Sequence, residues 1–207
     1  MNILAIDTST DVASLAVWRD GEILWKREIS SKKTHSSALF PALEEARDVA
    51  ARIDRIAVGL GPGSYAGVRI AIAGAFGLQF VWNCELVGIP SVLAVAPVGA
   101  HFRVIGDARR GAWYYSRIKN GECIDGPRLI ESAAALAEVL AGSDEAIFSA
   151  EVLPELWNAQ CRLPDAAILA ELAAAESGIL QRDDLEPLYL REPHITLTAP
   201  KKTALSK

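Results

Sequence analysis

Two segments of the sequence carry residue types that could hold a phosphate group. In the first, Asp7 ends a short apolar run, and Thr8, Ser9 and Thr10 follow it directly. Hydroxyl and backbone N–H groups in such a turn can donate hydrogen bonds to phosphate oxygens, and the carboxylate can hold a metal-bound water. A hairpin capped by its own side chains uses the same residue types, so a purely structural role stays open.

The second segment is a glycine-rich turn over residues 61–67, which reads Gly-Pro-Gly-Ser-Tyr-Ala-Gly. Ser64 can cap the apolar helix that follows. The unpaired N–H groups and the dipole of a helix N-terminus attract anions. The turn lacks the lysine of a P-loop, and its glycines could serve only to bend the chain. The candidate phosphate- or nucleotide-binding residues are therefore Asp7, Thr8, Gly61 and Gly63.

Other catalytic chemistry has little support in the spacing of residues. The histidines lack the spacing of a metal-binding pair, and they are His35, His101 and His194. The cysteines form no Cys-x-x-Cys pair, and they are Cys84, Cys123 and Cys161. No Ser-His-Asp set or Cys-His pair can be assembled by spacing. We therefore predict no catalytic residue and no metal site in this chain.

Composition limits the classes of function. The chain has 207 residues, of which 51% are hydrophobic, and a formal charge of −5. This charge argues against a protein that grips nucleic acid by itself, since such binding depends on clustered Lys and Arg. The longest apolar stretch, residues 66–82, is short for a membrane span and contains Arg69 and Gln79. With no signal-peptide pattern at the start, we expect a cytoplasmic protein without membrane association.

The elements that must position these residues follow from hydrophobic periodicity. Strands are predicted at 2–8, 12–19 and 22–28, with Asp20-Gly21 as a hairpin turn. A helix follows from residue 34 to about residue 51, then a strand at 55–60, the helix after the glycine turn, and a strand at 86–89. This order is that of a ribonuclease-H-like unit, in which helices cover a mixed sheet.

The second half of the chain repeats the pattern. Residues 102–107 resemble residues 3–7, and Asn120-Gly121 follows Asp107 at the separation that Asp20-Gly21 has from Asp7. A helix at 132–140, a strand at 146–149 and a helix at 165–176 continue the parallel. The turn after Asp107 reads as either an internal ion pair or a contact facing a cleft. We predict two lobes, residues 1–96 and residues 97–207, the second ending in a loose tail.

The helix after the glycine turn has two different sides when residues are placed at 100° intervals. One side is mostly small and suits close packing on a sheet; it holds Gly67, Ala71, Gly74, Ala75 and Leu78. The other side mixes large apolar residues with polar ends and holds Arg69, Ile72, Ala73, Phe76, Phe80 and Asn83. Such a face typically marks a partner surface. The alternative is that the second lobe covers it. The sequence therefore predicts either a protein interface or an internal lobe contact.

Five segments together resemble one bacterial protein family. They are residues 3–9, 35–41, 59–69, 107–111 and 187–191. The most specific is the run from Gly59 to Arg69, and the match extends over most of the chain. The sequence is similar to the TsaB (YeaZ) family, which acts in making threonylcarbamoyladenosine on tRNA. The resemblance implies an α/β ASKHA fold (the actin, sugar-kinase and Hsp70 class) with two ribonuclease-H-like lobes of mixed sheets flanked by helices.

The resemblance also implies partners and a role. TsaB-like proteins pair through the helices of the first lobe with a TsaD-like transferase, assemble with a TsaE-like ATPase, and form homodimers when alone. The metal-binding His-x-x-x-His of TsaD-like chains is missing from residues 88–95, and residues 147–151 lack the glycine pair that approaches a nucleotide base. The resemblance thus implies a non-catalytic scaffold or activator subunit that meets tRNA only through the complex. ATP and metal are expected in the partner subunits, and no cofactor in this chain.

Two other functions remain open at this point. The chain could be an active ATPase or phosphotransferase that uses Asp7 and Asp107. It could also be a metallopeptidase, a label attached to this wider family, but the missing spacing of zinc ligands makes that the weakest alternative.

Overall fold

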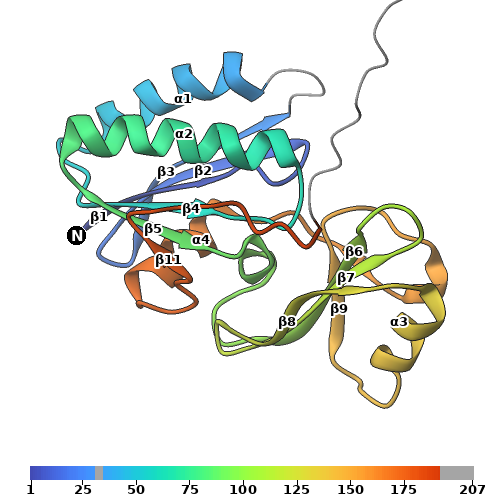
Figure 1. Cartoon of the computed structure of the whole chain (residues 1–207). Coiled ribbons are helices and arrows are strands. Elements are labelled where there is room, and N and C mark those ends of the chain that lie inside the picture. The colour runs from blue at the N-terminus through green and yellow to red at the C-terminus, as the bar shows by residue number, and fades with distance from the viewer. Residues whose placement is uncertain (31–34, 192–207) are drawn as a thin grey trace, which may run out of the picture.

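The computed structural model describes residues 1–30 and 35–191, and for residues 35–38 it describes the backbone alone. In this part of the chain the strands form two sheets (Figure 1). The first sheet has the strand order β11-β5-β4-β1-β2-β3. Its strands are β1 (Asn2–Asp7), β2 (Val12–Arg19), β3 (Glu22–Ser30), β4 (Arg55–Gly59), β5 (Glu85–Ile89) and β11 (Gln181–Arg182). The sheet is mixed, because β1 pairs antiparallel with β2 and parallel with β4.

Helices cover both faces of the first sheet (Figure 1). One face carries α1 (His35–Val49) and α2 (Tyr65–Trp82), and the other carries α4 (Ala166–Ala174). In α1 the periodicity holds, since Leu39, Leu43 and Ala46 are buried while Glu44 and Glu45 are exposed. The predicted helix thus forms, and Pro41 lies within it rather than ending it.

The second lobe holds a smaller sheet with the strand order β10-β9-β6-β7-β8. Its strands are β6 (His101–Asp107), β7 (Trp113–Lys119), β8 (Glu122–Ile130), β9 (Ala146–Ser149) and β10 (Gln160–Cys161). The remaining elements are the helix α3 (Ala133–Leu140) and the 3-10 turns η1 (Ser91–Val95) and η2 (Glu155–Trp157). The predicted repeat is visible in the hairpins, because β6 meets β7 as β1 meets β2. The predicted fold class, an α/β protein with two mixed sheets flanked by helices, is confirmed.

The predicted division at residue 97 falls between β5 and β6, but the chain returns to the first sheet near its end. The helix α4 packs on β1 and β2, and β11 joins β5 at the edge of the first sheet. The α4 residues Leu169 and Ala170 are fully buried in a core that also contains Ile3 and Phe102. The helix α4 packs there because the face of the first sheet opposite α1 and α2 is apolar and must be buried. The last part of the predicted second lobe therefore belongs to the first.

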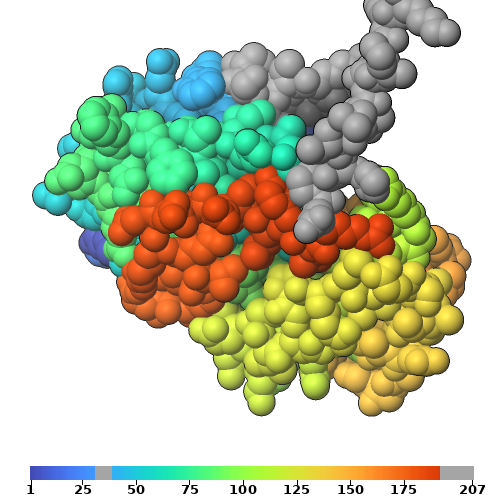
Figure 2. All heavy atoms as spheres, in the orientation of Figure 1, coloured from blue at the N-terminus to red at the C-terminus, as the bar shows by residue number. Residues whose placement is uncertain are grey.

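A C-terminal strap, residues 185–191, then runs along the junction of the lobes, where Figure 2 shows it in red. Leu185 is buried in the core beneath α2, and the Leu188 N–H donates to the Leu60 carbonyl at 2.9 Å. At the far end the Arg191 guanidinium donates to Glu131 at 3.2 Å, in the second lobe. The strap thus ties the lobes together. The predicted loose tail, the last ten residues, lies outside the described residues.

Candidate functional site: the cleft between the lobes and the outer face of α2

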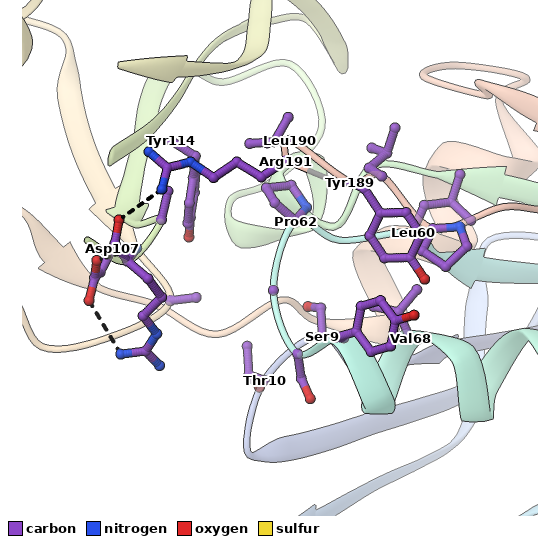
Figure 3. A pocket seen from close by; sticks show the side chains of 18 of the residues that line it. Ser9, Thr10, Leu60, Pro62, Val68, Asp107, Tyr114, Tyr189, Leu190 and Arg191 are labelled. Carbon is purple, nitrogen blue, oxygen red and sulfur yellow. Dashed lines mark hydrogen bonds and ion pairs between the residues drawn. The ribbon is translucent and has the colours of Figure 1, made fainter. Parts of the chain in front are cut away.

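A cavity of about 560 Å³ opens between the lobes (Figure 3). The β1–β2 hairpin and the start of α2 form one wall, and the β6–β7 turn forms the opposite wall. The C-terminal strap closes one side with Tyr189, Leu190 and Arg191. Segments that are distant in the sequence therefore line one cavity.

The wall of the first lobe depends on glycines that let two segments touch. A Cβ atom at Gly63 would overlap the carbonyl oxygen of Ser9, and one at Gly67 would overlap that of Thr8. In return, the Ser64 N–H donates to the Ser9 carbonyl at 2.6 Å, and the Thr8 hydroxyl donates to the Gly67 carbonyl at 2.7 Å. The hairpin and the glycine turn are thereby bound to each other.

Asp7 faces the interior rather than the cavity. Its Oδ1 accepts the Ser9 N–H at 2.9 Å and the Ser9 hydroxyl at 2.7 Å, while Oδ2 is buried without a hydrogen-bond partner among the described residues. Gly59 lies so close that a Cβ there would overlap Oδ2. Burial raises the pKa of the Asp7 carboxyl above its ordinary value, and the neighbouring Ser91 and Ser9 groups oppose the rise.

The structure thus brings the four predicted phosphate-site residues together but turns most of them away from the cavity. Of Asp7, Thr8, Gly61 and Gly63, Gly63 alone lines it. The Gly61 N–H donates to the Ser91 hydroxyl at 2.9 Å, and the Gly67 N–H donates to Ser64 at 3.2 Å. Several backbone donors that an anion would need are therefore occupied by the protein itself.

The wall of the second lobe is a network of charges. The Asp107 N–H donates to Glu151 at 2.7 Å, and Asp107 accepts the Arg109 N–H at 2.6 Å and its guanidinium at 3.3 Å. Both predicted alternatives for this turn hold, because the ion pair is internal and also lines the cleft. Arg109, Arg110 and Gly111 all have positive φ angles, which gives the turn its tight curvature. Asp107 is consequently engaged with its own turn.

Metal ligands do not gather in the part of the chain that the structure describes. Across residues 1–30 and 35–191 no group of three His, Cys, Asp or Glu side chains could hold an ion. His101 is exposed and lies 3.1 Å from Asn120, on the second lobe. His194 and the side chain of His35 are outside the described atoms.

Sequence reasoning missed the aromatic residues at the mouth of the cleft. Tyr65, at the start of α2, stacks on Tyr189 of the strap with ring centroids 5.0 Å apart. The Arg69 guanidinium lies 5.3 Å from the centroid of the Tyr65 ring and donates to its hydroxyl at 2.9 Å. We call Tyr65, Arg69 and Tyr189 the tyrosine platform. Its two rings are separated by more than one hundred residues, so no local pattern could join them.

The outer face of α2 is the second candidate site. Phe80 is 91% exposed, Ala73 and Asn83 are exposed, and Phe76 is half-buried. Ile72 differs from the prediction, because it is only 6% exposed and packs in the core with α1. We call Arg69, Ala73, Phe76, Phe80 and Asn83 the α2 face. By length and hydropathy α2 could cross a membrane, yet its buried residues, Val68 and Ala71 among them, pack on the sheet.

Two mixed sheets, each beginning with an antiparallel hairpin and flanked by helices, with a cleft between them, define an α/β protein of two sheets. Comparisons with known proteins narrow this class. The family model described as "TsaD: tRNA N6-adenosine threonylcarbamoyltransferase" matches residues 25–176. The chain belongs to this family and, within it, to the TsaB (YeaZ) group, as its sequence predicted.

Individual relatives agree with this assignment. An uncharacterized protein of Mycobacterium tuberculosis is 31% identical over 199 residues, which cover 92% of each chain. The tRNA threonylcarbamoyladenosine biosynthesis protein TsaB of Escherichia coli is 33% identical over 134 residues, 58% of each chain. Among solved structures, YeaZ from Pseudomonas aeruginosa matches with a TM-score of 0.75 and 22% identity, covering 91% of this chain and all of that one (100%). This last likeness shows the fold.

Proposed function

We propose that this chain is a non-catalytic accessory subunit in the biosynthesis of threonylcarbamoyladenosine on tRNA. Homologous proteins from several bacteria are named tRNA threonylcarbamoyladenosine biosynthesis protein TsaB, which supports a role for this chain in that biosynthesis. The narrower part of the proposal concerns how the chain acts. It would stabilise and activate a TsaD-like transferase rather than carry out the transfer itself.

The orientation of Asp7 supports the non-catalytic role. A carboxylate that positions a metal-bound water must reach the cleft, and that of Asp7 is buried and bonded to its own turn. Asp107 is held by Arg109. We accordingly propose that ATP and metal are bound by the partner subunits. Magnesium and ATP added to the isolated chain should give no turnover, and sustained hydrolysis would instead support the alternative of an active ATPase.

The observation that carries the proposal is the uncovered α2 face. Phe80 has almost its whole side chain in solvent, and neither the second lobe nor the strap covers it in the described residues. Exposed aromatic side chains on a helix are typical of protein interfaces. On α1, Phe40 is 55% exposed as well, so the helix pair offers a broader apolar surface. A standard interface buries about 800 Å² on each partner, which two helices of this length can supply.

We propose that a TsaD-like transferase occupies this surface in the complex, and that a second copy of the chain occupies it in isolation. A TsaE-like ATPase would join the assembly, and tRNA would be bound by the assembly as a whole. The chain would work in the cytoplasm, where tRNA is modified.

Co-purification with the transferase tests the α2 face. Phe76→Asp would place a charge in this face, but Phe76 packs partly against the core, so the change would also destabilise the fold. Phe80→Asp is cleaner because the side chain is exposed. We expect it to weaken the complex by roughly 30-fold or more, as removal of a central aromatic anchor does.

A matched control is Val152→Asp, which places the same charge at a residue of the second lobe that is 87% exposed. This variant should co-purify normally. If Phe80→Asp binds the transferase as well as the parent chain does, the α2 face is not the interface.

A further inference from the structure

The tyrosine platform shares Arg69 with the α2 face, but its two rings lie outside that face. Tyr65 is 47% exposed and Tyr189 is 42% exposed, so each ring leaves much of its surface open. The rings are nearly parallel, with 25° between their planes, and the Arg69 guanidinium lies beside them. Aromatic faces with a neighbouring guanidinium are a general means of holding an unstacked nucleobase, since every base has a π face.

The cavity next to the platform has polar groups on both walls. Arg109 and Arg191 line it on the side of the second lobe, and Ser64 lines it on the side of the first with a hydroxyl that accepts the Gly67 N–H. The Ser9 and Thr10 hydroxyls on that wall donate within the hairpin, to Asp7 and Val12. Figure 3 shows Ser9 and Thr10 across the cavity from Asp107 and its ion pair. Guanidinium and hydroxyl groups donate hydrogen bonds to phosphate and sugar oxygens. With a volume of about 560 Å³, the space can hold one nucleotide of a strand.

The charges at this mouth are balanced in a way that leaves one cation available. Asp107 is paired with Arg109, and Arg191 is paired with Glu131. Within residues 1–30 and 35–191, Arg69 has no carboxylate within ion-pair distance, and its hydrogen bond goes to the neutral Tyr65 hydroxyl. The acidic residues Asp11 and Glu151 also line the cavity, which opposes tight binding of a polyanion by this chain alone.

We propose that the tyrosine platform is an RNA contact, on which one unstacked base of the tRNA stacks against Tyr189 while the adjoining phosphate meets Arg69. This inference rests on the proposed function, because the complex must deliver the RNA. The hollow beside the platform favours an RNA strand over a protein helix. A helix suits the flat apolar surface further along α2, at Ala73 and Phe80.

The test is binding of fluorescently labelled tRNA to the complex of this chain with its transferase partner. Tyr189→Leu keeps an apolar side chain of similar reach but removes the planar ring, and we expect about 5-fold to 100-fold weaker binding, as loss of one base–aromatic stack causes. Tyr189→Phe keeps the ring and should bind tRNA as the parent complex does. Thermal unfolding of each variant reports whether the strap still holds.

Each outcome bears on the inference. Weaker tRNA binding by the leucine variant alone, with co-purification of the transferase unchanged, supports the RNA contact. Equal tRNA binding by all three complexes overturns it. Loss of the transferase together with tRNA in Tyr189→Leu overturns it as well, because the platform would then be a protein contact. If even the parent chain fails to bind the transferase, it is the proposed function that fails.

Discussion

At the scale of single residues, two glycines of α2 should respond in opposite ways to replacement by alanine. Gly67→Ala should destabilise the fold by about 1–3 kcal/mol, because its Cβ would overlap the carbonyl oxygen of Thr8. Gly77→Ala is the matched control in the same helix, where a Cβ would meet nothing within 4 Å. There the better helix propensity of alanine should add up to about 1 kcal/mol. Urea denaturation of the isolated chain measures both, and equal effects would contradict the close-packed hairpin.

The Asp7 carboxyl makes stability depend on pH. Burial raises its folded-state pKa above the ordinary value of 3.8, so the folded protein holds the proton more tightly than the unfolded chain does. The contribution of Asp7 is therefore most favourable at low pH and is lost as pH rises through the folded-state pKa. Asp7→Asn removes the charge and should raise the free energy of unfolding at pH 7 by roughly 1–3 kcal/mol.

This gain should shrink as pH falls below the raised folded-state pKa, where the carboxyl of the parent protein is protonated. Denaturation at a series of pH values checks it, with Asp11→Asn, an exposed neighbour, as the control that changes little. A loss of stability in Asp7→Asn at pH 7 would contradict this expectation and would show that the hydrogen bonds from Ser9 to the ionised carboxylate outweigh the cost of burying it.

The sequence predicts which strand or helix each of these residues adjoins, but not the direction in which its side chain points. Asp7 ends β1 and Gly63 precedes α2, as expected. The inward turn of Asp7 is held by its hydrogen bonds from Ser9, and it brings the carboxyl near Ser91, a residue far along the chain that no local pattern connects to it. Tyr189 reaches Tyr65 only because the strap returns to the first lobe. Contacts between distant segments are set by packing, which a periodicity cannot report.

At the scale of elements, the hydrophobic periodicity predicts which helices form and which side of each helix packs against the sheet. In α2 the small side is buried at Gly67, Ala71 and Ala75, as expected. Ile72 is the exception, since it lies at the border of the two sides and the neighbouring helix α1 encloses it. A helical wheel treats the sheet as the sole neighbour and therefore fails where a second helix adds to the cover.

A buried arginine holds the returning α4 and β11 in place. The Arg55 guanidinium is bound by Glu85 at 2.6 Å and also by Glu176 and the Ala173 carbonyl at the end of α4. Removing it in Arg55→Ala leaves the Ala173 carbonyl without this donor and leaves Arg182 as the cation that binds Glu85 and Glu176, so we expect a loss of about 1–3 kcal/mol. Arg52→Ala removes an exposed partner of Asp54 and should change stability by less than about 1 kcal/mol.

Chemical denaturation measures the free energy of unfolding of Arg55→Ala and of Arg52→Ala, and the two losses are compared. Similar small losses for both would mean that α4 is held by apolar packing alone. In that case Leu169 and its neighbours in the shared core would suffice to fix the helix on the sheet.

At the scale of the whole molecule, the repeat of strands predicts two lobes, while the path of the chain after residue 162 could not be predicted. The helix α4 has the same period whichever sheet it covers, and β11 has two residues, too few for any pattern. The chain returns to the first sheet because the second lobe buries only part of the apolar face opposite α1 and α2. The chain therefore crosses between the lobes more than once.

A chain whose α2 face is uncovered in the described residues should associate with itself when its partner is absent. We predict a homodimer in sedimentation equilibrium of the isolated chain, because two copies can bury Phe80 against each other across a twofold axis. Phe80→Asp should remain monomeric at every concentration, since dimerisation would bring two like charges together. Val152→Asp should dimerise as the parent does. Added transferase should dissociate the homodimer, because both partners would need the same face. A parent chain that stays monomeric, or a homodimer that persists beside bound transferase, would place the two contacts on different surfaces.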